Sequence, residues 1–129
     1  MRAKLIAANW KMNGSFALID AMQKVLSPLL EETTCEIVIC PPDVLLSSLN
    51  NKVKGSRIAV GAQNVHSETS GAFTGETSAP LLQECGVQWC IVAAPYTHLR
   101  AHETREELVC RLLLVKKKSS PAPPLRPSS

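Results

Sequence analysis

The first candidates for chemistry lie in a polar segment that directly follows a short apolar run. Asn9 and Lys11 come immediately after the run Lys4–Ala8, within the segment Asn9–Gly14. If the run is a strand of a parallel sheet, both side chains emerge at its carboxyl end, the edge where such sheets place catalytic and binding groups. The alternative is an ordinary surface turn, because Asn-Gly pairs are common in turns. The residue types and their spacing leave both interpretations open.

Histidines offer a second candidate chemistry, metal binding. His98 and His102 are spaced i, i+4, which places both imidazoles on one face of a helix, as a zinc site requires. Glu103 adjoins His102, but the residue order of a zinc-protease motif is absent and the sequence places no third ligand. His66 lies in a polar stretch and is expected at the surface. We therefore expect no metal site.

The elements that must position these residues alternate between strand and helix. Short apolar runs predict four buried strands, since helices are usually longer: Lys4–Ala8, Glu36–Cys40, Arg57–Ala62 and Val87–Ala93. Three helices are predicted between them, each starting at a residue whose side chain can cap a helix N-terminus. Their bounds are Ser15–Pro28, Asp43–Asn50 and Ser78–Gly86. Pro28 is expected to end or bend the first helix because proline lacks a backbone N–H.

This order of elements predicts an α/β protein. Apolar strands that do not alternate with polar residues, separated by helices, indicate a parallel sheet covered by helices. Right-handed crossovers allow either an open sheet or part of a closed eight-stranded barrel. Four strands are too few to close such a barrel. The polar stretch Gln63–Thr77 is a long loop, a kind of segment that is usually functional or disordered.

Charge and cysteine content narrow the class of protein. Residues 1–95 hold seven basic and eight acidic side chains, whereas residues 96–129 hold seven basic and three acidic ones. The overall charge of +3 therefore comes from the tail, and the body lacks the basic surface typical of nucleic-acid binding. Five cysteines without a CxxC pair, no secretory signal and no run that could span a bilayer indicate a reduced, cytoplasmic protein. We expect it to bind neither nucleic acid nor membrane.

Five segments resemble, in the same order, motifs of the triosephosphate isomerase family. The most specific is Asn9–Gly14, which is similar to that family's first-strand signature. The others lie at the ends of the second and third strands, in the long loop and before the fourth strand: Cys40–Pro42, Val60–Asn64, Gly71–Glu76 and Gly86–Trp89. The resemblance covers about residues 3–93. It implies a partial (β/α)₈ barrel that contains about the first four strands.

The resemblance also implies an activity. The family interconverts dihydroxyacetone phosphate and glyceraldehyde 3-phosphate, a step of glycolysis and gluconeogenesis, and needs no cofactor. A glutamate base moves the proton and a neutral histidine polarises the carbonyl beneath a lid loop. By resemblance, Lys11 would supply positive charge near the substrate's phosphate and the developing enediolate oxygen. Asn9 would donate a hydrogen bond to the same region.

A homodimer is implied as well. By resemblance, Thr74 in the protruding loop would reach across the dimer and brace the partner's Lys11 loop. The same interface would include Met12, Gln63, Asn64 and Glu76.

The resemblance fails at the end of the fourth strand. Where the family continues Gly-His-Ser-Glu-Arg-Arg, Ala93 stands in place of the glycine and Ala94 in place of the histidine. No residues match the family's catalytic glutamate, lid or phosphate-binding glycines. We therefore interpret residues 1–94 as the N-terminal half of the barrel and expect a truncated, inactive fragment. The alternative is a natural, non-catalytic truncated form that binds phosphate or heterodimerises with the full enzyme.

Residues 95–129 are interpreted as a foreign or low-complexity tail. Tyr96–Thr104 and Leu108–Leu114 resemble two stretches of a translated sequencing-library adapter, although Glu107 and Val115 do not fit it. The apolar spacing permits an amphipathic helix over residues 103–115. The proline-rich remainder is expected to be disordered coil.

Overall fold

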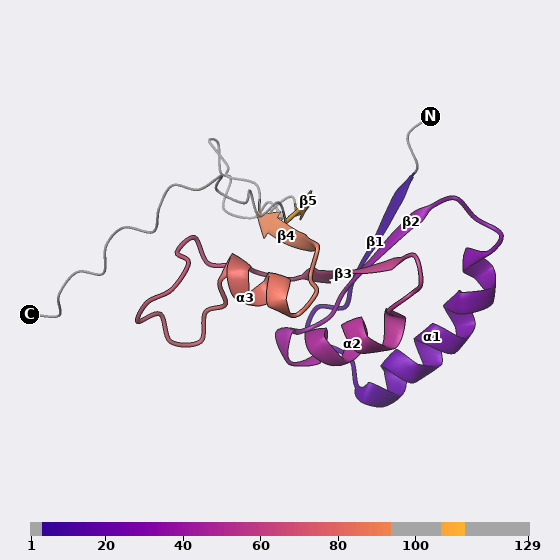
Figure 1. Ribbon diagram of the computed structural model, residues 1–129, viewed down its shortest axis with the longest axis horizontal. Helices are drawn as coiled ribbons and strands as arrows, with labels where there is room; N and C mark the ends of the chain where they lie inside the picture. The colour runs from indigo at the N-terminus through magenta and orange to yellow at the C-terminus, as the bar shows by residue number, and fades with distance from the viewer. Residues whose placement is uncertain (1–3, 94–106, 113–129) are drawn as a thin grey trace, which may run out of the picture.

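The computed structural model describes residues 4–93 and 107–112, and its sheet holds five strands in chain order (Figure 1). Four strands are parallel to one another, and the fifth pairs with the fourth in the antiparallel sense. The strands are β1 (Leu5–Asn9), β2 (Glu36–Cys40), β3 (Ile58–Ala62), β4 (Trp89–Ala93) and β5 (Glu107–Arg111). The four predicted strands are confirmed, and the sheet forms half of a barrel.

Helices connect the parallel strands, as the sequence predicts: α1 (Phe16–Leu30), the 3₁₀ turn η1 (Asp43–Leu45), α2 (Leu46–Val53) and α3 (Ala79–Glu84). Ser15 and Ser78 cap α1 and α3, because their hydroxyl oxygens accept hydrogen bonds from amides in the first turn. Gly86 follows α3 with φ of +81°, the left-handed conformation that ends a helix. Two of the three predicted caps, Ser15 and Ser78, and the predicted stop at Gly86 are confirmed.

The structure differs from the sequence prediction at the end of the first helix and at the cap of the second. α1 does not end at Pro28 but continues to Leu30, whose side chain is buried in the core. Proline at this position removes only one intrahelical hydrogen bond, and the burial of Leu30 favours the last turn. Asp43 does not cap α2, because η1 intervenes and has no side-chain cap. The Asp43 carboxylate instead accepts a hydrogen bond from the Thr77 hydroxyl at 3.0 Å.

The two faces of the sheet are buried unequally. Successive side chains of a strand point to opposite faces. The face covered by the helices belongs to a cluster of thirteen buried residues, among them Ile39, Leu49, Val60 and Leu82. The other face, which corresponds to the inside of a barrel, has a cluster of three buried residues: Val38, Cys40 and Ile91. Most of the core therefore lies between the sheet and its helices.

β5 replaces part of the helix predicted over residues 103–115. Residues 107–111 form a strand whose register places Cys110 opposite Cys90 and Val109 opposite Ile91. Val109 packs against the three-residue cluster, so pairing with the open edge of β4 overrides the local helical pattern. The rest of that predicted helix, His98, His102, the adapter-like stretch Tyr96–Thr104 and the proline-rich coil lie outside the described residues.

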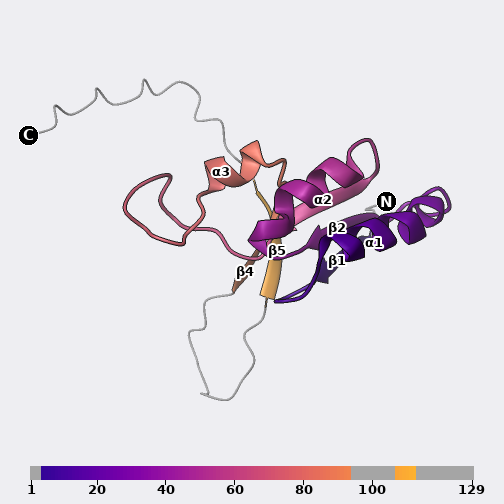
Figure 2. The same ribbon diagram turned by 90° about the horizontal axis from the view of Figure 1, so that it is seen from below.

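The long loop between β3 and α3 stands out from the body of the molecule. In both views it extends on the side opposite α1, and α2 lies between α1 and α3 (Figures 1 and 2). A short parallel bridge between His66 and Ser78 closes the base of the loop. In the part of the chain that the structure describes, no helix is long and apolar enough to cross a membrane.

Candidate functional site

Lys11 lies just beyond the carboxyl end of β1 in a strained backbone conformation. Its φ is +55°, in the left-handed region that residues other than glycine rarely adopt. The Asn9 side chain stabilises this turn, because its Oδ1 accepts a hydrogen bond from the Lys11 amide at 2.8 Å. Strain of this kind costs on the order of 1 kcal/mol and persists only where neighbouring groups fix the backbone. Asn9 is one of those groups.

Gln63 holds the same loop from two strands away. Its Nε2 donates one hydrogen bond to the Lys11 carbonyl at 2.8 Å and another to the Cys40 carbonyl at 2.9 Å. Cys40 ends β2, and its carbonyl also accepts from the Trp10 amide at 3.0 Å. One side-chain amide therefore joins the carboxyl ends of three neighbouring strands.

A close packing arrangement ends the loop. Gly14 has φ of +129°, and a Cβ there would lie 2.9 Å from both Leu45 Cδ1 and Trp10 Cε3. Only glycine fits this position. The Asn13 side chain donates a hydrogen bond to the Trp10 carbonyl at 2.9 Å. The turn Asn9–Gly14 is therefore held by hydrogen bonds at Trp10, Lys11 and Asn13 and by close packing at Gly14.

The Lys11 side chain itself is exposed. Among the described residues, its ammonium group has no hydrogen-bond or ion-pair partner, since the contacts of Lys11 are made by its backbone. A fixed backbone that presents an unneutralised cation is suited to binding an anionic group without reorganisation. The structure thus brings Asn9 and Lys11 together at the predicted edge.

The thiol of Cys40, whose carbonyl accepts hydrogen bonds at this turn, is a poor nucleophile at neutral pH. Cys40 is buried beneath the loop, and burial, reinforced by the nearby Cys90 thiol, raises its pKa to about 11. Burial likewise raises the pKa of Cys90 to about 11, with smaller contributions from Cys110 and Asp43. A thiol with so high a pKa holds little of the nucleophilic thiolate at neutral pH. The arrangement therefore supports electrostatic binding rather than covalent catalysis.

The other residues proposed for a subunit interface lie in the Lys11 turn or along the protruding loop. Met12 is 93% exposed, and Asn64, Thr74 and Glu76 are exposed along the protruding loop. Gln63 differs from them because its side chain is engaged within the chain. That contact spans 52 residues of sequence, and no local pattern indicates it.

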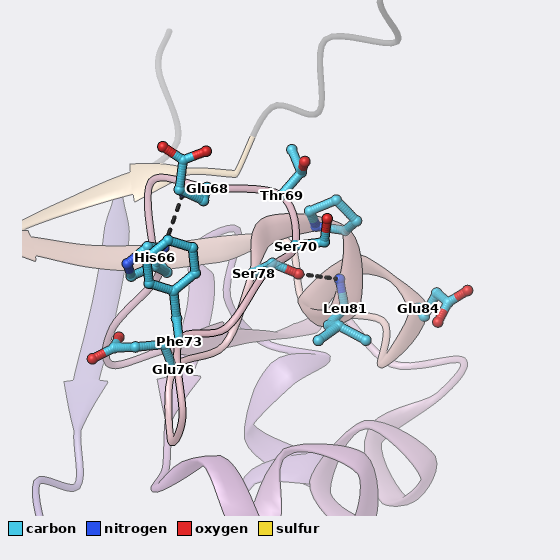
Figure 3. Close-up of a pocket in the computed structure, with 11 residues that line it drawn as sticks. His66, Glu68, Thr69, Ser70, Phe73, Glu76, Ser78, Leu81 and Glu84 are labelled. Carbon is cyan, nitrogen blue, oxygen red and sulfur yellow. Dashed lines mark hydrogen bonds between the residues drawn. The ribbon is translucent and has the colours of Figure 1, made fainter. Parts of the chain in front are cut away.

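The protruding loop and α3 together line a pocket of about 470 Å³ (Figure 3). At its centre the Phe73 ring lies against the His66 ring, with centroids 4.2 Å apart. His66 Nδ1 also accepts a hydrogen bond from the Glu68 amide at 3.0 Å. Three glutamates and no lysine or arginine line the pocket, so it is unsuited to a phosphate. Within residues 4–93 and 107–112, no group of three or more His, Cys, Asp or Glu side chains could hold a metal ion.

Parallel β/α units with a polar turn fixed at the carboxyl end of the first strand define this chain as part of a β/α-barrel protein. The family model described as triosephosphate isomerase matches residues 4–118. The chain belongs to the triosephosphate isomerase family. The resemblance of the five motifs and the partial-barrel fold are thereby confirmed. The match also extends beyond residue 93, where the motif resemblance ends.

Individual relatives agree with this assignment. A triosephosphate isomerase of Clostridium botulinum (strain Loch Maree / Type A3) is 43% identical over 106 residues, which are 82% of this chain and 43% of that protein. One from Albidiferax ferrireducens is 47% identical over 92 residues, 71% of this chain and 37% of that protein. The crystal structure of the Bartonella henselae enzyme superposes with a TM-score of 0.65 at 32% identity, over 72% of this chain and 38% of that one. The chain thus spans about two fifths of the length of these relatives.

Proposed function

We propose that this chain supplies the N-terminal part of a triosephosphate isomerase site, which interconverts dihydroxyacetone phosphate and glyceraldehyde 3-phosphate in cytoplasmic glycolysis and gluconeogenesis. The observation that carries the proposal is the Lys11 turn. Its backbone is fixed by Asn9 and Gln63, and its ammonium group is exposed at the carboxyl edge of the sheet. A small phosphorylated substrate is an anion of the kind that such a cation attracts.

The two site residues have distinct proposed roles. Lys11 places positive charge near the phosphate and the oxygen on which enediolate charge develops. Asn9, whose Oδ1 accepts a hydrogen bond from the Lys11 amide, lies beside Lys11 and would donate a hydrogen bond toward the same oxygen. Because the backbone of the turn is fixed before the substrate binds, presenting these side chains to the substrate needs no rearrangement of the backbone.

We further propose that the 129-residue chain does not catalyse the reaction by itself. Ala94 occupies the place of the electrophilic histidine, and no residue matches the glutamate base or the lid. General acid–base groups each contribute roughly 10²–10⁴-fold to the rate of such a reaction. Without the histidine and the glutamate, Lys11 and Asn9 have no proton transfer to assist. Ala94 itself lies outside the described residues.

The test compares this chain with one restored after Val92 by a Gly-His-Ser-Glu-Arg-Arg continuation and the remaining barrel of a relative. The assay follows glyceraldehyde 3-phosphate conversion through coupled reduction of the product. We expect background rates from the 129-residue chain and turnover from the restored protein. Lys11→Ala in the restored protein should lower kcat/KM by roughly 10²-fold or more, as removal of one preorganised charge typically does.

Lys54→Ala is the matched control for that substitution. Lys54 is also an exposed lysine, but it lies before β3, at the opposite end of the sheet from Lys11. It should leave kcat/KM unchanged. Turnover by the purified 129-residue chain would contradict the proposed inactivity, and a restored protein indifferent to Lys11→Ala would contradict the proposed site.

A homodimer is part of the same proposal. Thr74, Asn64 and Glu76 are exposed on the loop that stands away from the body, and Met12 is exposed beside Lys11. These positions suit a contact in which the loop of one subunit braces the Lys11 turn of the other, with Gln63 supporting that turn from within. Sedimentation of the restored protein tests this, because Thr74→Arg should shift a dimer toward monomers.

We also propose that the tail from about residue 95 is foreign to the barrel. The support is the loss of the family motif at Ala93 and Ala94 and the adapter-like stretches that follow. The genomic locus downstream of the Val92 codon provides the test. A Gly-His-Ser-Glu-Arg-Arg continuation supports the proposal, whereas a genuine exon encoding residues 95–129 supports a natural non-catalytic form that binds phosphate or heterodimerises with the full enzyme.

A further inference from the structure

Two cysteines face each other across the outer pair of strands. The antiparallel pairing of β4 and β5, which lie side by side in Figures 1 and 2, places Cys90 directly opposite Cys110. All five cysteines of the chain are free thiols in the structure. Within the described strands, this is the only place where the register sets two cysteines opposite each other. The pair takes no part in the proposed isomerase site.

Both cysteine side chains lie on the face of the sheet that the helices cover. Cys90 is buried in the cluster on that face, and Leu112 packs against the same cluster. Val109 packs against the three-residue cluster on the other face. Successive side chains of a strand point to opposite faces, so Cys110 lies on the same face as Leu112 and Cys90. The two thiols are therefore neighbours on one face of the sheet.

The spacing of the two strands suits a disulfide. The Leu112 amide donates a hydrogen bond to the Gln88 carbonyl at 2.7 Å, which makes these two residues a hydrogen-bonded pair of the ladder. Cys90 and Cys110 lie two positions further along each strand, so they form a pair of the same kind. In such pairs the Cα atoms lie about 5.5 Å apart, within the range of about 4.4–6.8 Å that disulfides span. The bond can therefore close without separating the strands.

The two thiols differ in their access to solvent. Cys110 is exposed, whereas Cys90 is only 1% exposed. Burial raises the pKa of Cys90 to about 11, and the Cys110 thiol is the next largest cause of that rise, so the two sulfurs interact electrostatically. An oxidant from solvent therefore reaches Cys110 first, and Cys90 reacts through Cys110.

We propose that Cys90 and Cys110 form a redox pair that a small disulfide, such as glutathione disulfide, converts to a cross-strand disulfide. The Cys110 thiolate attacks one sulfur of glutathione disulfide, which forms a mixed disulfide and releases one glutathione thiolate. The Cys90 thiolate then attacks the Cys110 sulfur, which closes the bond and releases the second glutathione thiolate. The two protein thiols lose two protons and two electrons, and the oxidant leaves as two molecules of reduced glutathione.

The disulfide would fix β5 in place along β4. β5 is the outermost strand of the described sheet, and it covers the edge of β4. An uncovered strand edge is a template for pairing with other chains. A covalent bond between the two strands restricts their separation, so oxidation keeps the β4 edge covered. This proposal is independent of the proposed function, because it involves neither Lys11 nor Asn9.

The test uses the purified 129-residue chain, first reduced with dithiothreitol and then incubated with glutathione disulfide at about pH 8.5, where exposed thiols are partly ionised. We expect the intact mass to fall by two hydrogen atoms with no glutathione attached. Cleavage after Trp89 and Arg105 should yield one linked peptide that contains Cys90 and Cys110. The Leu112 amide should exchange at least about tenfold more slowly in the oxidised chain, and dithiothreitol should reverse both changes.

Cys110→Ser should abolish the internal cross-link, and its exposed position means that the fold does not depend on the thiol. Cys85→Ser is the matched control and should leave the cross-link intact. In guanidinium the bonds should spread over all five cysteines. Four results would overturn the proposal: a mixed disulfide at Cys110 that never closes, a bond between two chains, a bond from Cys110 to Cys85, or the same yield of the Cys90–Cys110 bond in guanidinium as in the native chain.

Discussion

The position of Lys11 depends on groups that are distant in the sequence. Asn9 can be recognised as a turn residue from its place two positions before Lys11. Gln63 cannot, because its role arises only when the carboxyl ends of β1, β2 and β3 meet in one sheet. The residue types at the strand end therefore predict that Lys11 presents the charge. They do not predict that Gln63 holds the backbone of Lys11 in place.

Gln63→Ala should loosen the Lys11 turn. The substitution removes two hydrogen bonds, each contributing about 1 kcal/mol, and leaves the Lys11 carbonyl without its side-chain donor. In the restored protein we expect kcat/KM to fall roughly tenfold, with faster hydrogen exchange at the amides of Trp10 and Lys11. Gln88→Ala, at an exposed glutamine, is the control. Unchanged hydrogen exchange at the amides of Trp10 and Lys11 in Gln63→Ala would contradict the role of Gln63 in holding the turn.

The buried thiols predict a pH dependence. The pKa of Cys40 and of Cys90 is raised from 9.0 to about 11 in the folded chain, so their neutral forms favour folding. This contribution is fully present below pH 9 and is lost as pH rises through about 11. At pH 8 iodoacetamide should label Cys35, Cys85 and Cys110 before Cys40 and Cys90, whose labelling should accelerate toward pH 11. In guanidinium all five should react alike. Equal rates in the native chain would contradict the burial of Cys40 and Cys90.

At the scale of the elements, the helix caps make a measurable contribution. Ser15 Oγ accepts the Leu18 amide at 3.0 Å, and no other side chain caps α1. Ser15→Ala should therefore destabilise α1 by about 1 kcal/mol, seen as faster hydrogen exchange in its first two turns. Ser47→Ala, at an exposed position inside α2, should change exchange little. An effect of equal size from both substitutions would show that the cap is not the cause.

Elements with strong local signals could be predicted from the sequence. Glu36–Cys40 forms a strand with the predicted bounds, because an apolar run ends at two prolines there. Ser15 and Ser78 were predictable because capping is a contact within one turn. β5 was not, since the segment around Leu108–Arg111 suits a helix as well as a strand. The available edge of β4, a tertiary feature, decides between them.

For the whole molecule, the unequal burial of the two faces matters most. A closed barrel fills its interior with layers of side chains contributed by all its strands. Here the inner face has three buried residues against thirteen on the helix side. The sequence predicts apolar strands, but it cannot indicate this imbalance. An apolar strand has the same residue pattern whether or not other strands bury its inner face.

The last prediction concerns thermal unfolding of the 129-residue chain. With three buried residues in its inner cluster and large apolar side chains exposed on β1 and α1, the described core gains less from burial than an ordinary domain of this length, while its ordering entropy is similar. We expect a broad calorimetric transition whose enthalpy lies well below the roughly 90 kcal/mol typical of 129 globular residues. Its van't Hoff enthalpy should not match the calorimetric one. A sharp two-state transition of the chain alone would show that the helix-side core is sufficient.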